Sequence, residues 1–431
     1  MITARAFAGK HYAVYGLARS GLATVEALLA SGARVTAWDA KEEARANAPA
    51  GTEIANLEEV DLSQFDSLVV TPGLPLNRHP IAQRARDADV EIIGDIELFA
   101  RARPELPPHK VVGITGTNGK STTTALVHHI LKTAGVPTTM GGNIGLPILL
   151  QEPLPEGGVY VLELSSYQID LTQSLGCDVA VLLNITPDHL DRYESFEAYI
   201  ASKYRLFWMQ SDEHVAVLAT RDRQFVDRLL NTSERPTHCC YPSLREEIEP
   251  SERQRNWPAL QGPHNAQNAV AAIVTCRLLG LTDEQIDDGL STYPGLPHRM
   301  ERVREKDGVT FVNDSKATNP TATAPALAAF ESIRWILGGQ AKTDNLDECA
   351  PFFGHVRAAY TIGEAADLFE RLLSPHIPVK NCGKLDEAVR QAAADAQAGD
   401  TVLLSPACAS FDQFRDFEDR GDQFRALVEG L

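Results

Sequence analysis

The chain has 431 residues, of which 44% are hydrophobic and 23% charged, and its formal net charge is −18. This length predicts about three domains of about 150 residues each, and the acidic balance disfavours nonspecific binding to nucleic acid or to an anionic membrane. Seven cysteines without a C-x-x-C pair indicate a reduced, cytoplasmic protein, and we expect neither a secretory leader nor a membrane-spanning segment.

The N-terminal part has the pattern of a Rossmann unit. A strand at 12–15 leads into the turn Gly16–Gly21 and a helix, and a second strand at 34–38 ends at Asp39. The middle glycine of G-x-G-x-x-G is replaced by Ala18, at the position that lets backbone approach a pyrophosphate. Two interpretations therefore stay open: a nucleotide diphosphate held less closely, or a purely structural turn.

A further strand is predicted at 67–70, and it runs into a loop at 71–73. In open α/β sheets, ligands bind at such carboxyl ends of strands. The segment 101–110 contains three prolines and is interpreted as a linker, so the first domain is expected to end there.

The sequence VVGITGTNGKSTTT at 111–124 predicts a strand, a phosphate-binding loop and a helix. Backbone N–H groups of such a loop close around phosphate oxygens, Lys120 would reach the β/γ-phosphates, and Ser121 would offer its hydroxyl to Mg²⁺. The leading glycine is Gly113, one residue early, and Ile114 stands where the strict pattern has glycine. The alternative is an ordinary glycine-rich turn; the pattern favours a nucleoside triphosphate, ATP.

Polar groups follow the next predicted strands. Met140–Gly145 is interpreted as a glycine-rich loop, and Glu163 interrupts an apolar strand at 159–164. A carboxylate there is costly unless it meets a cation, so Glu163 is a candidate Mg²⁺ ligand, with a satisfied core acid as the alternative. The strand at 179–184 precedes the cluster 188–191, Asp-His-Leu-Asp, a candidate metal or phosphate site.

Lys203 lies in the middle of the apolar face of a helix that begins near Ser195. Its neighbours at helical spacing are Tyr199, Ile200, Leu206 and Phe207, and no acid stands at i±3 or i±4. Burial favours the neutral amine, which can react with CO₂ to give a metal-ligating carbamate. The alternative, favoured by these residues alone, is a lysine whose stem packs while its head reaches water.

The segments that follow carry weaker signals. A strand is predicted at 214–219, a helix at 222–230 and a polar surface excursion at 231–261. Asn265 is a candidate N-cap of the next helix, and Asn268 a candidate contact to adenine.

The final third alternates strands and helices, which predicts a third parallel α/β domain after a linker at 293–299. Its strands are predicted at 302–304, 309–313, 335–337 and 401–404. Lys316, Lys342 and Ser410 follow strand ends and could receive carboxylates.

The chain contains, in this order, the segments GTNGKSTTTAL, GGNIG, LELSSYQ, NITPDHLDRY, SKYRLF, GPHNAQNA, LPHRME, NDSKATNP, LGGQAK and SPACASFDQF. Through them it resembles the Mur ligase family over about residues 12–424. The last four segments most resemble the members that add D-glutamate.

The resemblance implies an α/β fold of three domains. These are a Rossmann-like domain at 1–103 for the UDP-linked substrate, a P-loop NTPase-like domain at 104–297 for ATP, and a Rossmann-like domain at 298–431 for the amino acid. The implied activity is ATP-dependent joining of D-glutamate to UDP-N-acetylmuramoyl-L-alanine in peptidoglycan precursor synthesis. The implied route passes through an acyl phosphate and a tetrahedral intermediate, and a monomer is expected.

The resemblance also implies the site residues. Those implied for catalysis are Lys120, Glu163, His189 and Lys203. The implied nucleotide contacts are Gly116, Thr117, Asn118, Gly119, Lys120, Ser121, Thr122, Asn268, Arg299 and Asp314. The implied contacts to the UDP substrate are Arg19, Ser20, Asp39, Lys41, Gly73, Asn143 and His189. Those implied for D-glutamate are His298, Lys316, Thr318, Lys342, Ser410, Phe411 and Phe417.

Two Mg²⁺ ions are implied as cofactors beside ATP, with Ser121, Glu163, His189 and a carbamylated Lys203 as metal-site residues. The resemblance thus favours carbamylation of Lys203 over the exposed-head alternative. Gln340 departs from the family pattern, which commonly has an acid there.

Other functions remain alternatives at this stage. Within the same class they are a Mur ligase that adds alanine or a diamino acid, and a folylpolyglutamate synthase. A dinucleotide-dependent oxidoreductase built on Gly16–Gly21 is opposed by Ala18 and by the ATP loop. An ATP-driven binding switch without ligation is the third alternative.

Overall fold

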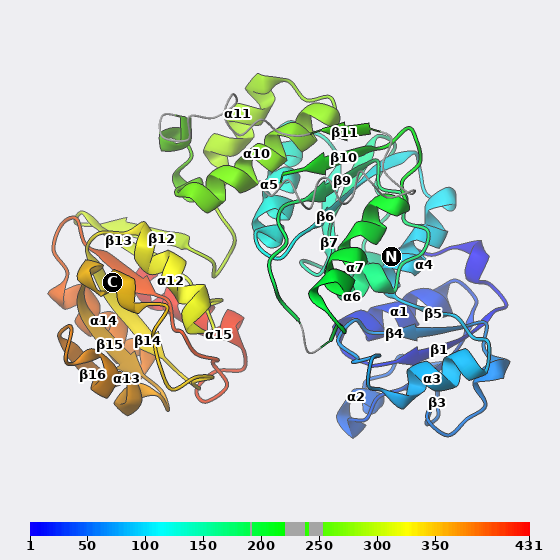
Figure 1. The fold of residues 1–431 in the computed structure, drawn as a ribbon, viewed down its shortest axis with the longest axis horizontal. Coiled ribbons are helices and arrows are strands. Elements are labelled where there is room, and N and C mark those ends of the chain that lie inside the picture. Colours follow the sequence, from blue (N-terminus) through cyan, green and yellow to red (C-terminus); the bar gives the residue numbers. More distant parts are fainter. Residues whose placement is uncertain (190–191, 220–237, 241–252) are drawn as a thin grey trace. The chain divides into compact units, whose positions relative to one another are not determined.

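The computed structural model describes residues 1–189, 192–219, 238–240 and 253–431. The chain divides into two compact units, whose elements are labelled in Figure 1. Unit 1 consists of Met1–Arg253 with Pro263–Ser291, and unit 2 consists of Gln254–Gly262 with Thr292–Leu431. Two of the three sheets lie in unit 1 and one in unit 2, which agrees with the predicted α/β fold class.

The first sheet is parallel, with strand order β3-β2-β1-β4-β5. Its strands are β1 (His11–Tyr15), β2 (Arg34–Trp38), β3 (Glu53–Ile54), β4 (Ser67–Val70) and β5 (Ile92–Ile93), and its helices are α1 (Arg19–Ala30), α2 (Glu42–Ala46), α3 (Pro80–Asp87) and α4 (Asp95–Ala102). The strands predicted at 12–15, 34–38 and 67–70 are confirmed. Because β1 and β4 are neighbours, the turns that follow them meet at one edge of the sheet.

The second sheet is also parallel, with strand order β11-β10-β9-β6-β8-β7. Its strands are β6 (His109–Thr115), β7 (Thr138–Gly142), β8 (Gly158–Glu163), β9 (Val179–Leu182), β10 (Val215–Leu218) and β11 (His238–Cys240), and its helices are α5 (Lys120–Thr133), α6 (Ser166–Asp170), α7 (Phe196–Trp208), α10 (Pro263–Leu278) and α11 (Asp283–Thr292). Since β6 lies between β8 and β9, the loop after β6 is flanked by the carboxyl ends of both neighbours.

Two local predictions for unit 1 are wrong, and two further predictions fall wholly or partly outside the described residues. Residues 140–142 belong to β7, so the predicted glycine-rich loop begins only at Asn143. The expected linker at 101–110 contains the end of α4, a 3₁₀ turn and the start of β6. The helix predicted at 222–230 lies outside the described residues. The predicted surface excursion at 231–261 is described only in part, and there Trp257 is buried.

The first two sheets are joined by a shared core and by buried polar contacts. The rings of Phe99, from α4, and Tyr160, from β8, lie 5.1 Å apart within one hydrophobic cluster. The buried carboxylate of Glu97, also on α4, accepts hydrogen bonds from the backbone N–H groups of Gln173 and Ser174 at 2.7 and 2.9 Å. A carboxylate that accepts several hydrogen bonds in a buried position holds its donors firmly, so the first sheet is fixed to the second through α4.

The third sheet has strand order β12-β13-β17-β14-β15-β16. Its strands are β12 (Glu301–Lys306), β13 (Val309–Asn313), β14 (Ile333–Gly338), β15 (Val356–Ile362), β16 (Val379–Gly383) and β17 (Thr401–Leu404), and its helices are α12 (Pro320–Ala329), α13 (Ala366–Leu373), α14 (Leu385–Asp395) and α15 (Phe417–Glu429). The prediction of a wholly parallel sheet is wrong at one edge, because β12 pairs with β13 in antiparallel fashion. The connection from β12 to β13 is a tight turn, too short for a parallel crossover.

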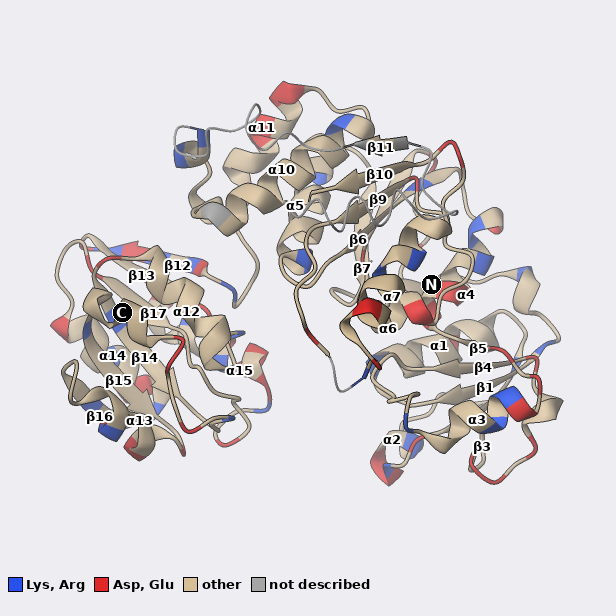
Figure 2. Ribbon diagram, viewed as in Figure 1, with Lys and Arg blue, Asp and Glu red and all other residues tan. Residues whose placement is uncertain are grey.

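The helices of the described ranges are amphipathic or sheet-covering, and none of them is long and apolar enough to cross a membrane. Short 3₁₀ helices lie at Arg5–Phe7, Leu62–Gln64, Arg103–Glu105, Ile148–Leu150, Gln254–Asn256, Pro258–Leu260 and Ala350–His355. Basic and acidic residues are interspersed on the helices and loops of both units (Figure 2).

Candidate active site

The loop between β6 and α5 is a tight glycine turn packed against neighbouring segments. Gly116 and Gly119 have φ angles of 154° and 85°, which disfavour residues with a Cβ atom. A Cβ on Gly119 would lie 2.3 Å from Oδ1 of Asn268. Asn184, after β9, accepts from the N–H of Asn118 at 2.8 Å and donates to its carbonyl at 3.0 Å. The loop is therefore held at the N-terminus of a 14-residue helix, where the helix dipole favours an anion.

The remaining predicted nucleotide residues of the loop lie along the start of α5. The hydroxyl of Thr117 donates to the carbonyl of Thr186 at 3.1 Å, and Tyr199 Oη lies 3.2 Å from it. Ser121 and Thr122, in the first turn of α5, are buried. The loop thus brings a hydroxyl-rich helix start to the carboxyl edge of the sheet.

Two lysines converge on the carbonyl of Gly116. Lys120 Nζ donates to it at 3.0 Å and to the carbonyl of Thr117 at 2.8 Å. Lys203 Nζ, from α7, donates to the same Gly116 oxygen at 3.0 Å and lies 4.6 Å from the centre of the Tyr199 ring. The loop lysine and the helix lysine therefore share one backbone acceptor.

The interpretation of Lys203 as a lysine with its head in water is wrong. Its side chain is only 1% exposed. Burial, and then the charge of Lys120, lower the pKa of Lys203 to about 7. An amine with this pKa has a substantial neutral fraction at neutral pH, and the neutral form is the one that reacts with CO₂.

Glu163 ends β8, where it pairs with Ile114 of the neighbouring strand β6. It is 2% exposed, and its Oε1 accepts from Nδ2 of Asn143 at 2.9 Å. Its Oε2 is buried and has no hydrogen-bond partner. An unpaired buried carboxylate oxygen is costly, so this position fits a cation such as Mg²⁺.

His189 lies next to aromatic rings, in a strained backbone conformation with φ of 54°. Its ring centre is 4.9 Å from that of Tyr167 and 6.2 Å from that of Tyr199, and its Nε2 is 3.6 Å from Asp188 Oδ2. Asp191 lies outside the described residues. Within the described ranges, no three His, Cys, Asp or Glu side chains form a group that could hold a metal ion.

Asn268 does contact the phosphate loop, but the predicted N-cap at Asn265 is wrong. The helix α10 begins at Pro263, two residues earlier, and places Asn265 within its first turn. Asn265 Oδ1 accepts instead from Nδ2 of Asn268 at 3.3 Å.

Five of the seven predicted contacts to the UDP substrate lie at the carboxyl edge of the first sheet, whereas Asn143 and His189 follow strands of the second sheet. Asp39 accepts from the N–H of Leu17 at 2.7 Å and from that of Lys41 at 2.9 Å. Arg19 donates to the carbonyl of Gly145 at 2.6 Å, across to the second sheet. Nothing lies within 4 Å of a Cβ built on Gly73. Asp39 therefore shapes the turn, while Arg19 links it to the second sheet.

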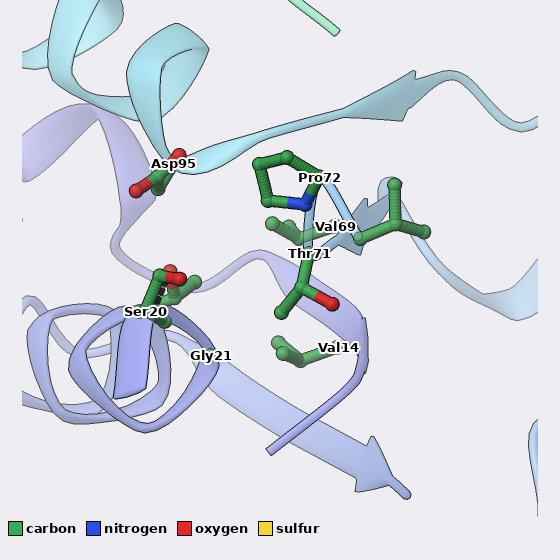
Figure 3. A pocket seen from close by; sticks show the side chains of 9 residues that line it. Val14, Ser20, Gly21, Val69, Thr71, Pro72 and Asp95 are labelled. Carbon is green, nitrogen blue, oxygen red and sulfur yellow. Dashed lines mark hydrogen bonds between the residues drawn. The ribbon is translucent and has the colours of Figure 1, made fainter. Parts of the chain in front are cut away.

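A small cavity lies beside the start of α1 (Figure 3). Its volume is about 10 Å³, enough for one water molecule. Ser20, Thr71 and Asp95 line it. Burial raises the pKa of Asp95 to about 6, and its Oδ1 accepts from the N–H of Ile96 at 3.0 Å. Asp95 carries no distinct sequence signal, because one acid at a helix start is ordinary.

In unit 2, the residues predicted to bind the amino-acid substrate lie at the carboxyl edge of the third sheet. Lys342 Nζ donates to Thr318 Oγ1 at 3.2 Å. Lys316 Nζ lies 5.8 Å from the ring centre of Phe417, and the ring of His298 lies 6.2 Å from the same ring. Lys316 and Lys342 come from the loops after β13 and β14, and Phe417 is the first residue of α15.

The other predicted residues of unit 2 differ widely in exposure. Ser410 is 2% exposed, whereas Phe411 is 69% exposed. Asp314 is buried, accepts from Ser405 Oγ at 2.7 Å and from the N–H of Met300 at 3.1 Å, and burial raises its pKa to about 7. Arg299 is partly buried.

Gln340 forms a backbone bridge with Ala409, with two hydrogen bonds of 2.9 Å. This bridge uses only main-chain atoms, so it does not depend on the residue type at position 340.

Three family models match the chain in order. They are described as Mur ligase MurD-like, N-terminal domain, over residues 10–94, Mur ligase middle domain, over 114–276, and Mur ligase, glutamate ligase domain, over 298–408.

Similar proteins include the UDP-N-acetylmuramoylalanine–D-glutamate ligase of Sphingopyxis alaskensis, which is 62% identical, with 100% of both chains covered. That of Zymomonas mobilis is 54% identical, again over 100% of both chains. Among solved structures, the UDP-N-acetylmuramate-alanine ligase MurC of Thermotoga maritima superposes with a TM-score of 0.60 at 18% identity, covering 98% of this chain and 99% of that one. This last likeness concerns the fold alone.

Proposed function

Because the chain belongs to the Mur ligase family, we propose that the residues at the carboxyl edges of its three sheets carry out a single ligation reaction. The chain is an ATP-dependent ligase of the type EC 6.3.2.9, which joins D-glutamate to UDP-N-acetylmuramoyl-L-alanine in peptidoglycan synthesis. The observation that carries this function is the identity of 54–62% to three such ligases over the full length of the chain.

The proposed division of labour follows the three sheets. Residues 1–103 bind the UDP-linked substrate, 104–297 bind ATP and 298–431 bind D-glutamate. The first sheet supplies Arg19, Ser20, Asp39, Lys41 and Gly73, and the second supplies Asn143 and His189, to the UDP-linked substrate. Support comes from the bond of Arg19 to Gly145, which ties the first-sheet turn to the loop that carries Asn143.

The reaction needs an activated carboxylate, because a free carboxylate is a poor electrophile. In the proposed first step, an oxygen of the alanine carboxylate bonds to the γ-phosphorus of ATP, the bond to the β–γ bridging oxygen breaks, and ADP leaves. The amine of D-glutamate then attacks the acyl phosphate carbon, and the tetrahedral intermediate expels phosphate and loses a proton. Lys120 stabilises the charge that develops on the transferred phosphoryl group.

The proposed nucleotide contacts lie in two groups. In unit 1 they are Gly116, Thr117, Asn118, Gly119, Lys120, Ser121, Thr122 and Asn268, and in unit 2 they are Arg299 and Asp314. The tight glycine turn and the helix start support the first group. The polar, buried setting of Asp314 supports the second.

Two Mg²⁺ ions are proposed as cofactors, held by Ser121, Glu163, His189 and a carbamylated Lys203. When bound, Mg²⁺ neutralises phosphate charge. The unpaired Oε2 of Glu163 fits a cation, and the buried amine of Lys203 fits conversion to an anionic ligand. Such a carbamate is the additional ligand that the described His, Cys, Asp and Glu side chains do not provide.

The proposed D-glutamate contacts are His298, Lys316, Thr318, Lys342, Ser410, Phe411 and Phe417. Two lysines suit an amino acid with two carboxylates. We further propose that the protein acts as a monomer in the cytoplasm, where ATP is available. The buried cysteines Cys177, Cys276, Cys349 and Cys408 are free thiols, which agrees with a reducing compartment.

An amino-acid panel tests the proposed function. Phosphate release is measured with ATP, Mg²⁺ and UDP-N-acetylmuramoyl-L-alanine while the amino acid is varied. D-Glutamate should give turnover, whereas L-alanine, a diamino acid and L-glutamate should give little. Turnover with one of these others and none with D-glutamate would reject the assignment.

A Glu163→Ala substitution tests the metal role. Turnover should fall at least about 100-fold, because a charged ligand is lost, while affinity for ADP without Mg²⁺ stays within about threefold. The control is Glu156→Ala, in the exposed turn before β8, which should leave both quantities unchanged. Full turnover of the Glu163→Ala enzyme contradicts the role.

A further inference from the structure

Arg420, on α15, is the most completely buried charged residue of unit 2, with an exposed fraction of 0%. Its Nε donates to Ser315 Oγ at 2.9 Å, and its two terminal nitrogens donate to backbone carbonyls. These carbonyls belong to Ser315 at 2.8 Å, Cys408 at 3.1 Å, Ala409 at 3.4 Å and Gly338 at 3.5 Å. The planar fork of arginine is the side chain that can reach this many acceptors at once.

The acceptors belong to three separate loops at the carboxyl edge of the third sheet. Ser315 follows β13, Gly338 ends β14, and Cys408 and Ala409 follow β17. A Cβ on Gly339 would lie 2.3 Å from the Ala409 carbonyl and 3.2 Å from the Arg420 guanidinium. The three loops therefore close tightly around one cation.

The same three loops carry the proposed amino-acid residues. Lys316 is the residue after Ser315, Ser410 is the residue after Ala409, and Lys342 lies in the loop that begins at Gly338. Whatever sets the spacing of these loops also sets the spacing of the groups that receive the two carboxylates of D-glutamate.

Arg420 has no acidic partner among the ion pairs of the described ranges, which include Arg415 and Arg425 on the same segment. Burial lowers its pKa to about 10, so it remains protonated at neutral pH. Neutral carbonyls offset the cost of burying this cation only in part, and the charge of Asp412, which raises the pKa of Arg420, offsets it further without forming an ion pair. Such a charge is stabilised further when an anion binds nearby.

We propose that Arg420 is a positioning residue for the amino-acid substrate. It holds the three loops at the spacing that a dicarboxylic amino acid requires, and its fixed positive charge favours binding of the two carboxylates. This role rests on the proposed function and on the placement of the D-glutamate site in unit 2. Arg420 does not touch the substrate, because its guanidinium is enclosed by the loops themselves.

Steady-state kinetics of the full-length enzyme with Arg420→Lys test this role. Lysine retains the charge but cannot form the fork, so the KM for D-glutamate should rise about tenfold. The KM values for ATP and for UDP-N-acetylmuramoyl-L-alanine should stay within about twofold, a split that general loss of structure would not produce. Arg420→Met, which also removes the charge, should raise the KM for D-glutamate further, at least about 100-fold.

The matched control is Arg304→Lys. Arg304 also donates to two backbone carbonyls, those of Val428 and Glu429 at 3.0 Å each, but at the far end of α15. This variant should keep all three KM values within about twofold.

Lys342→Ala separates the possible failures. If Lys342→Ala raises the KM for D-glutamate and Arg420→Lys does not, the positioning role is wrong while the proposed site stands. If neither variant changes it, the placement of the D-glutamate site is wrong as well. An equal rise of all three KM values for Arg420→Lys also overturns the role, and the lysine variant decides the matter if Arg420→Met does not fold.

Discussion

The turn after β1 and the loop after β6 have the same place in two parallel sheets, but they differ in charge. Both connect a buried strand to a helix through glycines with positive φ, Gly16 at 98° and Gly119 at 85°. In the first turn the backbone N–H of Leu17 is bonded to the Asp39 carboxylate. In the second loop, the ammonium groups of Lys120 and Lys203 both donate hydrogen bonds to the carbonyl of Gly116.

In the proposed function, one backbone arrangement serves two ligands. The strand–turn–helix geometry supplies a helix N-terminus at a sheet edge in both cases. The lysines make the second loop suitable for the triphosphate of ATP, where charge must be neutralised during transfer. Asp39, the acid that follows β2 and bonds to the first turn, is typical of a site that binds a nucleotide through its hydroxyl groups.

Removing the cation of the second loop should have the largest effect. In Lys120→Met the catalytic efficiency should fall about 1000-fold, since an interaction with the transferred phosphoryl group worth about 4 kcal/mol is lost. Phosphate release measures it. Lys132→Met, at the exposed end of the same helix, serves as the control and should behave like the unsubstituted enzyme. A variant at position 120 with more than a tenth of normal efficiency would show that the loop does not depend on its charge.

Adding one methyl group to the first turn should have the next largest effect, a loss of stability. A Cβ on Gly21 would lie 1.8 Å from the carbonyl oxygen of Gly16, so Gly21→Ala should lower the free energy of unfolding by about 3 kcal/mol. Urea unfolding, monitored for unit 1, measures this change. Gly73→Ala, where nothing lies within 4 Å, should change it by less than about 0.5 kcal/mol. Equal effects of the two substitutions would mean that the first turn is not tightly packed.

The acid beneath the first turn should have a smaller, pH-dependent effect. Burial raises the pKa of Asp95 from 3.8 to about 6, so the folded state binds this proton more tightly than the unfolded state. Stability from this group is therefore present below about pH 4 and is lost as pH rises to about 6, a change of about 2–3 kcal/mol. Asp95→Asn should accordingly be more stable than the unsubstituted protein above pH 6 and similar to it near pH 4.

Unfolding midpoints measured between pH 4 and pH 8 test this dependence. Asp61→Asn provides a control of opposite sign, because hydrogen bonds from Ser63 lower the pKa of Asp61. That variant should be less stable than the unsubstituted protein at neutral pH, and the difference should disappear in acid. An Asp95→Asn curve parallel to that of the unsubstituted protein would contradict the burial of a charged carboxylate.

Local sequence patterns predicted where helices and strands occur better than they predicted the residues at which these elements begin and end. The strands at 34–38, 309–313 and 401–404 match β2, β13 and β17 residue for residue, because each is a short apolar run bounded by polar or glycine residues. The start of α10 was misplaced, because Asn265 is a good cap in isolation while Pro263 is favoured in a first turn.

Lys203 illustrates that the sequence pattern predicts burial of a side chain but not its distant hydrogen-bond partner. Its place on the apolar face of α7 predicted burial of the stem, and the same pattern allowed the head to reach water. Its acceptor is the carbonyl of Gly116, 87 residues earlier, and no helical period carries information about so distant a partner. Arg420 is a sharper case, since four of its five acceptor atoms come from loops that follow β13 and β17, and a lone arginine on a polar helix is ordinarily solvated.

The sequence by itself determined the chemistry of this protein: the phosphate loop, the strand-end acid and the order of the family segments name an ATP-dependent ligase. Only the tertiary structure decided which groups meet, because strand order and packing depend on non-local contacts. It placed two lysines on one carbonyl, left one oxygen of Glu163 unpaired and enclosed Arg420 among three loops. Those contacts determine which charged groups are buried and which of them are paired, and the contacts themselves follow from the fold.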